Sequence, residues 1–192
     1  DVLVLACIAI LVALDFHKLV GDRVVVRWER LCVEQQEQVD PEAAQNRIME
    51  TLQKDLHLKE LPVHIECFDN SNIQGTNPAS ACVVFKKAKP AKADYRKFNI
   101  KTVEGPDDFA SMAEVVHRRY KRLRDEGEAL PQLIIVDGGK GQLSSAVGAL
   151  EDLGLMGKVA IIGIAKRLEE LYFPGDSIPL HLDKRSESLK LI

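Results

Sequence analysis

The sequence has 192 residues, of which 46% are hydrophobic and 29% are charged. This length excludes a mini-protein that needs disulfides or metals to fold, and the composition excludes disordered and collagen-like chains, so we expect one sizeable core. The net charge of -3 hides an uneven distribution, because residues 86–124 contain 12 Lys and Arg but only 5 Asp and Glu. A basic middle in an otherwise acidic chain favours an anionic partner.

Residues 1–39 form an atypical N-terminal segment to which no fold can be assigned. The apolar run at residues 2–14 is shorter than the roughly 20 residues that span a bilayer, and it lacks the basic flank and cleavage site of a signal peptide. Since the chain starts at Asp1 and not at Met, we expect a fragment of a longer protein. The four cysteines lack metal-ligand spacing, which favours a reduced, cytoplasmic protein.

The first regular element predicted is a helix that starts near residue 40. Asp40 suits the N-cap and Pro41 suits the first helical position. Apolar residues at positions 48, 52 and 56 then recur at helical spacing, so one face of the helix is expected to be buried. Pro62 is expected to end the helix.

Three strands are predicted next. Residues 63–69 alternate so that every second side chain shares a face, and Asp69 falls at the carboxyl end of this strand. Residues 70–78 are rich in Asn, Ser and Gly and predict a turn, which leads to further strands at residues 79–87 and 95–100. The short links between these strands indicate an antiparallel meander.

The second half of the chain alternates helices with buried strands. Asp107 or Asp108 can cap a helix that Gly127 ends. The apolar positions of this helix are Phe109, Met112, Val116, Tyr120 and Leu123. Residues 133–136 are continuously apolar, which is typical of a strand buried on both faces, and Asp137 follows directly.

A glycine-rich turn after Asp137 opens a second helix, which Gly154 ends, and residues 159–164 predict another buried strand. The order of elements over residues 40–192 therefore predicts an α/β domain. It would combine an antiparallel three-strand meander, parallel strands in the same mixed sheet, and flanking helices.

Two aspartates point to metal chemistry. Asp69 and Asp137 each end a buried strand, and a mixed sheet can bring two such strands side by side. Two adjacent carboxylates repel unless a cation neutralises them or they share a proton, so the pair indicates Mg2+ or Mn2+. Taken singly, each aspartate is more simply explained as a residue that caps the following turn.

The basic middle predicts contacts with phosphates. The side chains expected to contact DNA there, or beside the proposed metals, are Lys86, Arg96, Lys97, Arg118, Arg119, Arg122, Lys140 and Gln142. Tyr95 and Phe98 lie among them and could stack on bases. The alternative is a solvated face, in which Glu114 pairs with Arg118 and lysines keep the hairpin soluble.

The turn at residues 138–144, GGKGQLS, fails the spacing of a phosphate-binding P-loop and of a dinucleotide fingerprint. A nucleotide-binding domain is therefore a second hypothesis. Lys140 and Gln142 would either position a phosphate or shape the turn. Ser71 and Ser144 have no evident His and Asp partners, so a hydrolase triad has no support.

Six segments match one family in order. They are residues 66–75 (ECFDNSNIQG), 95–100 (YRKFNI), 105–112 (GPDDFASM), 118–120 (RRY), 134–142 (IIVDGGKGQ) and 164–170 (IAKRLEE). From about residue 40 onward the chain closely resembles the ribonuclease H-like endonuclease domain of UvrC, the incising component of the bacterial UvrABC excinuclease of nucleotide excision repair. Endonuclease V-like proteins share the fold, but these motifs favour UvrC.

The resemblance implies a metal-dependent endonuclease that cuts the damaged strand 5′ to a lesion, with damaged double-stranded DNA as substrate and UvrB as partner. It implies that Asp69 and Asp137 bind Mg2+ or Mn2+, and that Asp108 is a further catalytic acid or a helix cap. The family often has His where this chain has Asn72, so no proton transfer is expected there.

The family's R-D-E-x-H segment, which supplies a further carboxylate and a histidine, is expected to follow residues 186–192. We therefore expect a domain truncated at its C-terminus, with weak or absent activity on its own. The alternative function is a catalytically inert ribonuclease H-like module that binds DNA or a repair partner.

Overall fold

The computed structural model describes residues 40–71, 79–103, 105–165, 170–182 and 186–188. The atypical N-terminal segment and the centre of the turn predicted at residues 70–78 lie outside these residues. The chain divides into two compact units, residues 1–44 and residues 45–192, and the second carries the sheet described below.

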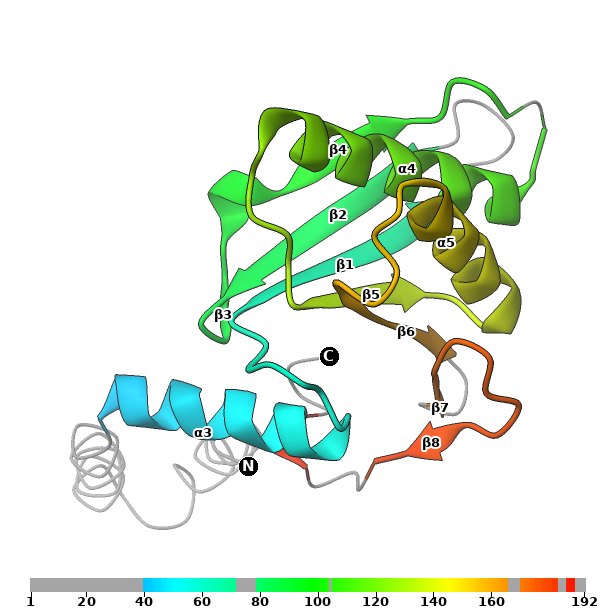
Figure 1. The fold of residues 1–192 in the computed structure, drawn as a ribbon. Coiled ribbons are helices and arrows are strands. Elements are labelled where there is room, and N and C mark those ends of the chain that lie inside the picture. Colours follow the sequence, from blue (N-terminus) through cyan, green and yellow to red (C-terminus); the bar gives the residue numbers. More distant parts are fainter. Residues whose placement is uncertain (1–39, 72–78, 104, 166–169, 183–185, 189–192) are drawn as a thin grey trace, which may run out of the picture. The chain divides into compact units, whose positions relative to one another are not determined.

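Eight strands of the described residues form one sheet. They are β1 (His64–Ser71), β2 (Ala79–Lys86), β3 (Lys89–Pro90), β4 (Arg96–Asn99), β5 (Leu133–Asp137), β6 (Ala160–Ala165), β7 (Glu170–Tyr172) and β8 (Leu180–His181). Their order is β3-β2-β1-β5-β6-β7-β8, with β4 also paired to β2 (Figure 1).

The sheet is mixed, as the sequence predicted. β1, β2 and β4 form the antiparallel meander, and β1, β5 and β6 run parallel at the centre. The end of the sheet was not predicted, because β7 and β8 are antiparallel additions beyond β6. These short strands carry too little periodicity to be recognised from sequence.

Three α-helices are described, α3 (Pro41–Asp55), α4 (Asp108–Glu126) and α5 (Lys140–Asp152), together with the short 3-10 helix η1 (Lys92–Asp94). The capping predictions are confirmed where the structure tests them: the Asp40 carboxylate accepts from Glu42 N at 3.0 Å, and Gly127 ends α4 in the left-handed conformation. α3 ends at Asp55, before Pro62, because His57 has φ 51° and breaks the helical path.

The two faces of the sheet are covered differently. α4 and α5 pack together on one face, where Phe68 and Val136 join their core cluster (Figure 1). Leu52 and Leu56, from α3 and the residue after it, join a second cluster with Leu133 and neighbouring strand residues on the opposite face. Since side chains alternate along a strand, this division decides where each polar strand residue points.

Among the residues that the structure describes, no helix is both long and apolar enough to cross a membrane.

Candidate metal and nucleic-acid site

Asp69 and Asp137 occupy matching positions on neighbouring parallel strands. The β1–β5 ladder pairs Ile65 with Leu133 and ends at Phe68 with Val136, so the next residue on each strand is an aspartate. Adjacent strands lie about 4.8 Å apart, so the ends of β1 and β5 that carry the aspartates are neighbours. A cation shared by the two carboxylates stays a prediction.

Both aspartates continue the face of the sheet opposite α4 and α5. On β1 and β5 the residues two positions earlier, Cys67 and Ile135, belong to the cluster on that face. The register extends the row across the sheet, because Ala81 on β2 lies opposite Asp69 and Lys97 on β4 lies opposite Ala81. Ala81 and Lys97 are exposed, so this part of the face is open to solvent and to a substrate.

This arrangement fits a divalent metal. Mg2+ and Mn2+ prefer carboxylate oxygens and retain several waters, so two carboxylates in one row form a minimal donor set. Within the described ranges, no group of three or more His, Cys, Asp and Glu side chains is placed to hold a metal. The candidate site in this part of the chain therefore consists of the aspartate pair.

Asp108 lies at the start of α4, which covers the face of the sheet opposite the aspartate pair. Asp107 supplies the cap of α4, because its carboxylate accepts from Phe109 N at 3.0 Å and Ala110 N at 2.9 Å. Asp108 is thus the first helical residue and its side chain is exposed. The Asn70 side chain donates to the Asp108 carbonyl at 3.0 Å, which ties the start of α4 to the end of β1.

The loop after Asp137 is tightly packed. A Cβ at Gly138 would lie 1.4 Å from the Gln142 side chain, so Gln142 folds back over the loop. A Cβ at Gly163 would lie 2.9 Å from the Gly138 carbonyl, so the strand beside Asp137 also requires a glycine. Gln142 therefore shapes this turn, which was one of the two roles expected for it.

Helix α5 begins beside the same strand end without a side-chain cap, since its N-cap is Gly139. Uncapped N–H groups and the positive end of a helix dipole are suited to a phosphate. Lys140 adds a cation there, although its Nζ donates to the Ser177 carbonyl at 2.6 Å and lies 5.0 Å from the Tyr172 ring centre. A cavity of about 350 Å³ adjoins Lys140, between α5 and residues 173–177.

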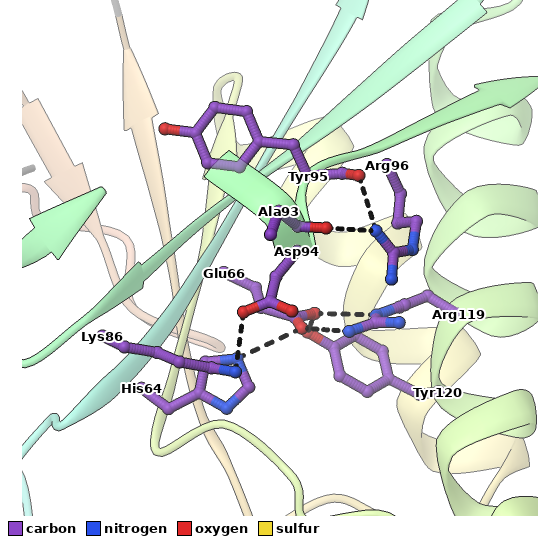
Figure 2. A network of polar contacts seen from close by, with 9 residues as sticks. All are labelled: His64, Glu66, Lys86, Ala93, Asp94, Tyr95, Arg96, Arg119 and Tyr120. Atoms are coloured by element: carbon purple, nitrogen blue, oxygen red, sulfur yellow. Dashed lines mark hydrogen bonds and ion pairs between the residues drawn. The ribbon is translucent and has the colours of Figure 1, made fainter. Parts of the chain in front are cut away.

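The other basic side chains do not form one surface. Lys86 binds Asp94 at 2.7 Å, and Arg96 donates to the carbonyls of Ala93 and Tyr95 (Figure 2). Arg122 pairs with Glu126 at 2.8 Å within α4. Of the eight side chains predicted to contact DNA, Lys97 is the one in the same row as the aspartates.

Arg119 lies elsewhere than expected. Its side chain is 12% exposed, and its guanidinium donates twice to the fully buried Glu66, at 2.6 and 3.3 Å (Figure 2). The Tyr120 hydroxyl also donates to Glu66, at 2.9 Å, and His64 Nε2 lies 3.4 Å from it. Arg119 is thus bound inside the domain, and we leave it out of the proposed DNA-contacting set.

The Glu66 cluster is a polar part of the core between β1 and α4. Burial alone raises the pKa of the Glu66 carboxyl, but its contacts with His64, Arg119 and Tyr120 outweigh burial and lower the pKa to about 2. Burial also raises the pKa of Tyr120, which keeps its hydroxyl protonated as a donor. Sequence reasoning missed Glu66, although a charged residue on the helix-facing side of an alternating strand is a detectable sign.

Glu114 holds the segment between β4 and α4. Its carboxylate accepts from Lys101 N, from the backbone and hydroxyl of Thr102, and from Arg118. Burial raises the pKa of Glu114, but the bonds from Thr102, Lys101 and Arg118 lower it to about 2. The Glu114–Arg118 ion pair considered from the sequence is therefore present, and it uses part of the hydrogen-bonding capacity of Arg118.

The aromatic residues are also distributed differently from expectation. Tyr95 and Phe98 pack against the core cluster under α4, and Arg118 lies 5.7 Å from the Phe98 ring centre. Phe109, expected on the buried face of its helix, is instead 55% exposed. It occupies the first turn of α4, next to the end of β1, where helical spacing alone does not decide burial.

Comparison with known proteins gives a consistent result. Residues 53–192 match the model of the UvrC RNase H endonuclease domain. The chain is 73% identical over 154 residues to the UvrABC system protein C of Flavobacterium johnsoniae, covering 80% of this chain and 26% of that protein. With the protein of the same name from Cytophaga hutchinsonii it is 60% identical over 179 residues, covering 93% of this chain and 30% of that protein.

The chain thus spans between a quarter and a third of the length of these relatives. Among solved structures, an endonuclease V of Ciona intestinalis in complex with an inosine-containing DNA matches with a TM-score of 0.41 and 20% identity. That match covers 74% of this chain and 64% of the endonuclease V chain.

Proposed function

Because this chain belongs to the family of the UvrC RNase H endonuclease domain, we propose that it is the metal-dependent domain that incises a damaged DNA strand 5′ to a lesion. The observation that carries this proposal is that Asp69 and Asp137 directly follow the last residues paired between two neighbouring parallel strands, at an open face of the sheet. Full activity would belong to the longer protein acting with UvrB on damaged double-stranded DNA.

In the proposed mechanism the protein positions charges and does not form a covalent intermediate. Asp69 and Asp137 would hold Mg2+ or Mn2+, which supplies an activated water and stabilises the negative charge that develops on the phosphate. The strands would hold the two carboxylates in one row at the end of the sheet. The scissile phosphate would then bind to groups that are already in position. Asp108, whose carbonyl accepts a hydrogen bond from Asn70 of β1, is proposed as an auxiliary acid at the flank of this edge.

We propose that DNA crosses the open face beside the aspartates. Lys97 would contact a phosphate from the same row, and Lys140 with the uncapped start of α5 would receive the neighbouring backbone. Lys86, Arg96 and Arg118 bind protein acceptors, as Lys140 does, and their DNA contacts stay a prediction. Arg122 pairs with Glu126 on α4, away from the row of aspartates, and is not included in the proposed DNA contacts. The spacing of the four cysteines in the sequence favours a reduced, cytoplasmic setting.

The proposal is tested by incision of a lesion-bearing duplex by the complete excinuclease carrying Asp69→Asn or Asp137→Asn. Each substitution preserves side-chain size but removes one negative charge from the row, so 5′ incision should be lost. Asp152→Asn, an exposed position at the end of α5, is the matched control and should cut normally.

The 3′ incision provides an internal control, because the resemblance to UvrC implies that a separate N-terminal nuclease domain makes that cut. Loss of the 5′ cut with a retained 3′ cut supports the assignment. Normal 5′ incision by both variants would refute it. It would leave the chain as the alternative, an inert module that binds DNA or a repair partner.

A further inference from the structure

Phe109 is an exposed aromatic ring at the edge that carries the aspartates. It is 55% exposed, and the other large hydrophobic side chain exposed among the described residues, Ile178, belongs to the loop before β8. A single exposed apolar residue is common on protein surfaces, so exposure alone assigns no role to Phe109. The position of the ring and its fixed geometry are more informative.

The first turn of α4, which carries Phe109, contacts the segments that follow both aspartates. On one side, the carbonyl of Asp108, the residue before Phe109, accepts a hydrogen bond from Asn70, which directly follows Asp69. On the other side, the ring lies against Gly141, four residues after Asp137: a Cβ at Gly141 would come within 2.5 Å of Phe109 Cε1. Phe109 thus bridges the segments that follow both carboxylates.

The backbone of Phe109 is fixed and one edge of its ring lies against Gly141, while much of the ring surface is uncovered. The Asp107 cap fixes the backbone of Phe109 and Ala110, and Gly141 allows the edge of the ring to approach the backbone of α5. A ring that is already ordered loses little further conformational entropy when a flat ligand stacks on it. Phe109 therefore has the properties of a stacking platform.

The surrounding charges favour a nucleobase as the ligand. The uncapped start of α5 and Lys140 attract a phosphate, whereas Asp107 and Asp108 repel one from the immediate neighbourhood of the ring. A nucleotide satisfies both conditions when its phosphate faces α5 and its uncharged base covers Phe109. An apolar protein segment would leave the cationic part of this surface unmatched.

We propose that Phe109 stacks on a nucleobase of the DNA strand bound beside Asp69 and Asp137, an inference that rests on the nuclease function proposed above. Such a contact requires a base that is unpaired or displaced from its neighbour, because the faces of a base are covered inside a regular duplex. Phe109 would therefore favour distorted or single-stranded DNA at the incision edge without reading its sequence.

The test is binding of the complete protein, without divalent metal, to a single-stranded oligonucleotide that contains 2-aminopurine. Phe109→Ala and Phe109→Leu should weaken binding roughly 5- to 150-fold, the range that alanine substitution of a stacking aromatic gives, and should abolish the fluorescence change on binding. Phe109→Tyr should preserve both, because it keeps the ring. Ile178→Ala is the matched control, since it removes an exposed apolar side chain elsewhere.

Wild-type binding by Phe109→Ala would overturn the proposal. Wild-type binding by Phe109→Leu would also overturn it, because a generic apolar contact would then suffice. Unchanged DNA binding in all Phe109 variants, combined with a defect in assembly with the partner proteins, would assign the ring to a protein interface instead. Failure here is distinguishable from failure of the nuclease function, since Asp69→Asn and Asp137→Asn should retain the fluorescence change while losing the 5′ cut.

Discussion

Glu66 and Arg119 form a buried ion pair that joins the central strand β1 to helix α4, with donor–acceptor distances of 2.6 and 3.3 Å. Removing one partner of a buried pair leaves an unneutralised charge in the core, which costs about 3–5 kcal/mol. Glu66→Ala should therefore lower the free energy of unfolding by an amount of this order, measured by urea denaturation. Lys121→Ala, which breaks the exposed pair with Asp125, should change it by about 0.5 kcal/mol or less. Equal effects would contradict the structural role of Glu66.

The lowered pKa values of two carboxyl groups predict how the stability of the domain depends on acidic pH. Glu66 and Glu114 have folded-state pKa values of about 2, below the ordinary value of 4.5. The unfolded chain thus binds protons that the folded chain does not, so their stabilisation is complete above about pH 4.5 and is lost as the pH falls toward 2. The urea concentration at the unfolding midpoint, recorded between pH 6 and 2.5, should therefore decrease once the pH drops below about 4.5. In Glu114→Gln the fall should be shallower, because one of the two titrating groups is gone.

Gly163 should tolerate substitution less well than Gly148. A Cβ at Gly163 would lie 2.9 Å from the Gly138 carbonyl and 3.2 Å from Leu143 Cβ, and we expect Gly163→Ala to cost about 1–3 kcal/mol through overpacking. It should also reduce incision, since the displaced loop follows Asp137. Gly148 lies in α5 with nothing within 4 Å of its Cβ position, so Gly148→Ala should stabilise the domain by about 0.5–1 kcal/mol. Similar urea midpoints for the two variants would refute the packing argument.

The aspartate pair predicts stabilisation by metal. A cation that binds only the folded state at ten times its Kd contributes about 1.4 kcal/mol, which raises Tm by roughly 3–6 °C in a domain of this size. Thermal melts with and without Mn2+ should show this rise in the wild-type protein and lose it in Asp69→Asn and Asp137→Asn. Asp152→Asn should keep it. If Asp69→Asn and Asp137→Asn both showed the full rise in Tm, the metal would have to bind elsewhere.

The salt dependence of DNA binding should distinguish Lys97 from Arg122. Lys97 lies in the row of the aspartates, whereas Arg122 is on α4 and pairs with Glu126. Lys97→Gln should reduce the log-log salt slope by about 0.9, the value expected for one lost phosphate contact on B-DNA. Arg122→Gln should leave the slope close to that of the wild type. The reverse result would indicate that DNA follows the outer side of α4 and not the open sheet face.

Much of the fold followed from local patterns. Alternation over residues 63–69 and the apolar run at 133–136 predicted strands, and Asp40 and Gly127 marked helix ends, because these features depend on backbone geometry within a few residues. The same patterns placed Asp69 and Asp137 at strand ends. Their pairing could be proposed from sequence, but not their register.

Only the tertiary structure decided which side chains share a surface. Arg119 and Lys97 both belong to the basic middle of the sequence, yet Arg119 is bound to buried Glu66 and Lys97 lies on the open face with the aspartates. Phe109 fits the apolar spacing of α4, yet it is exposed because the first helical turn lies at the end of β1. Strand register and the position of a helix against its sheet are set by contacts between residues distant in sequence, which local periodicity does not encode.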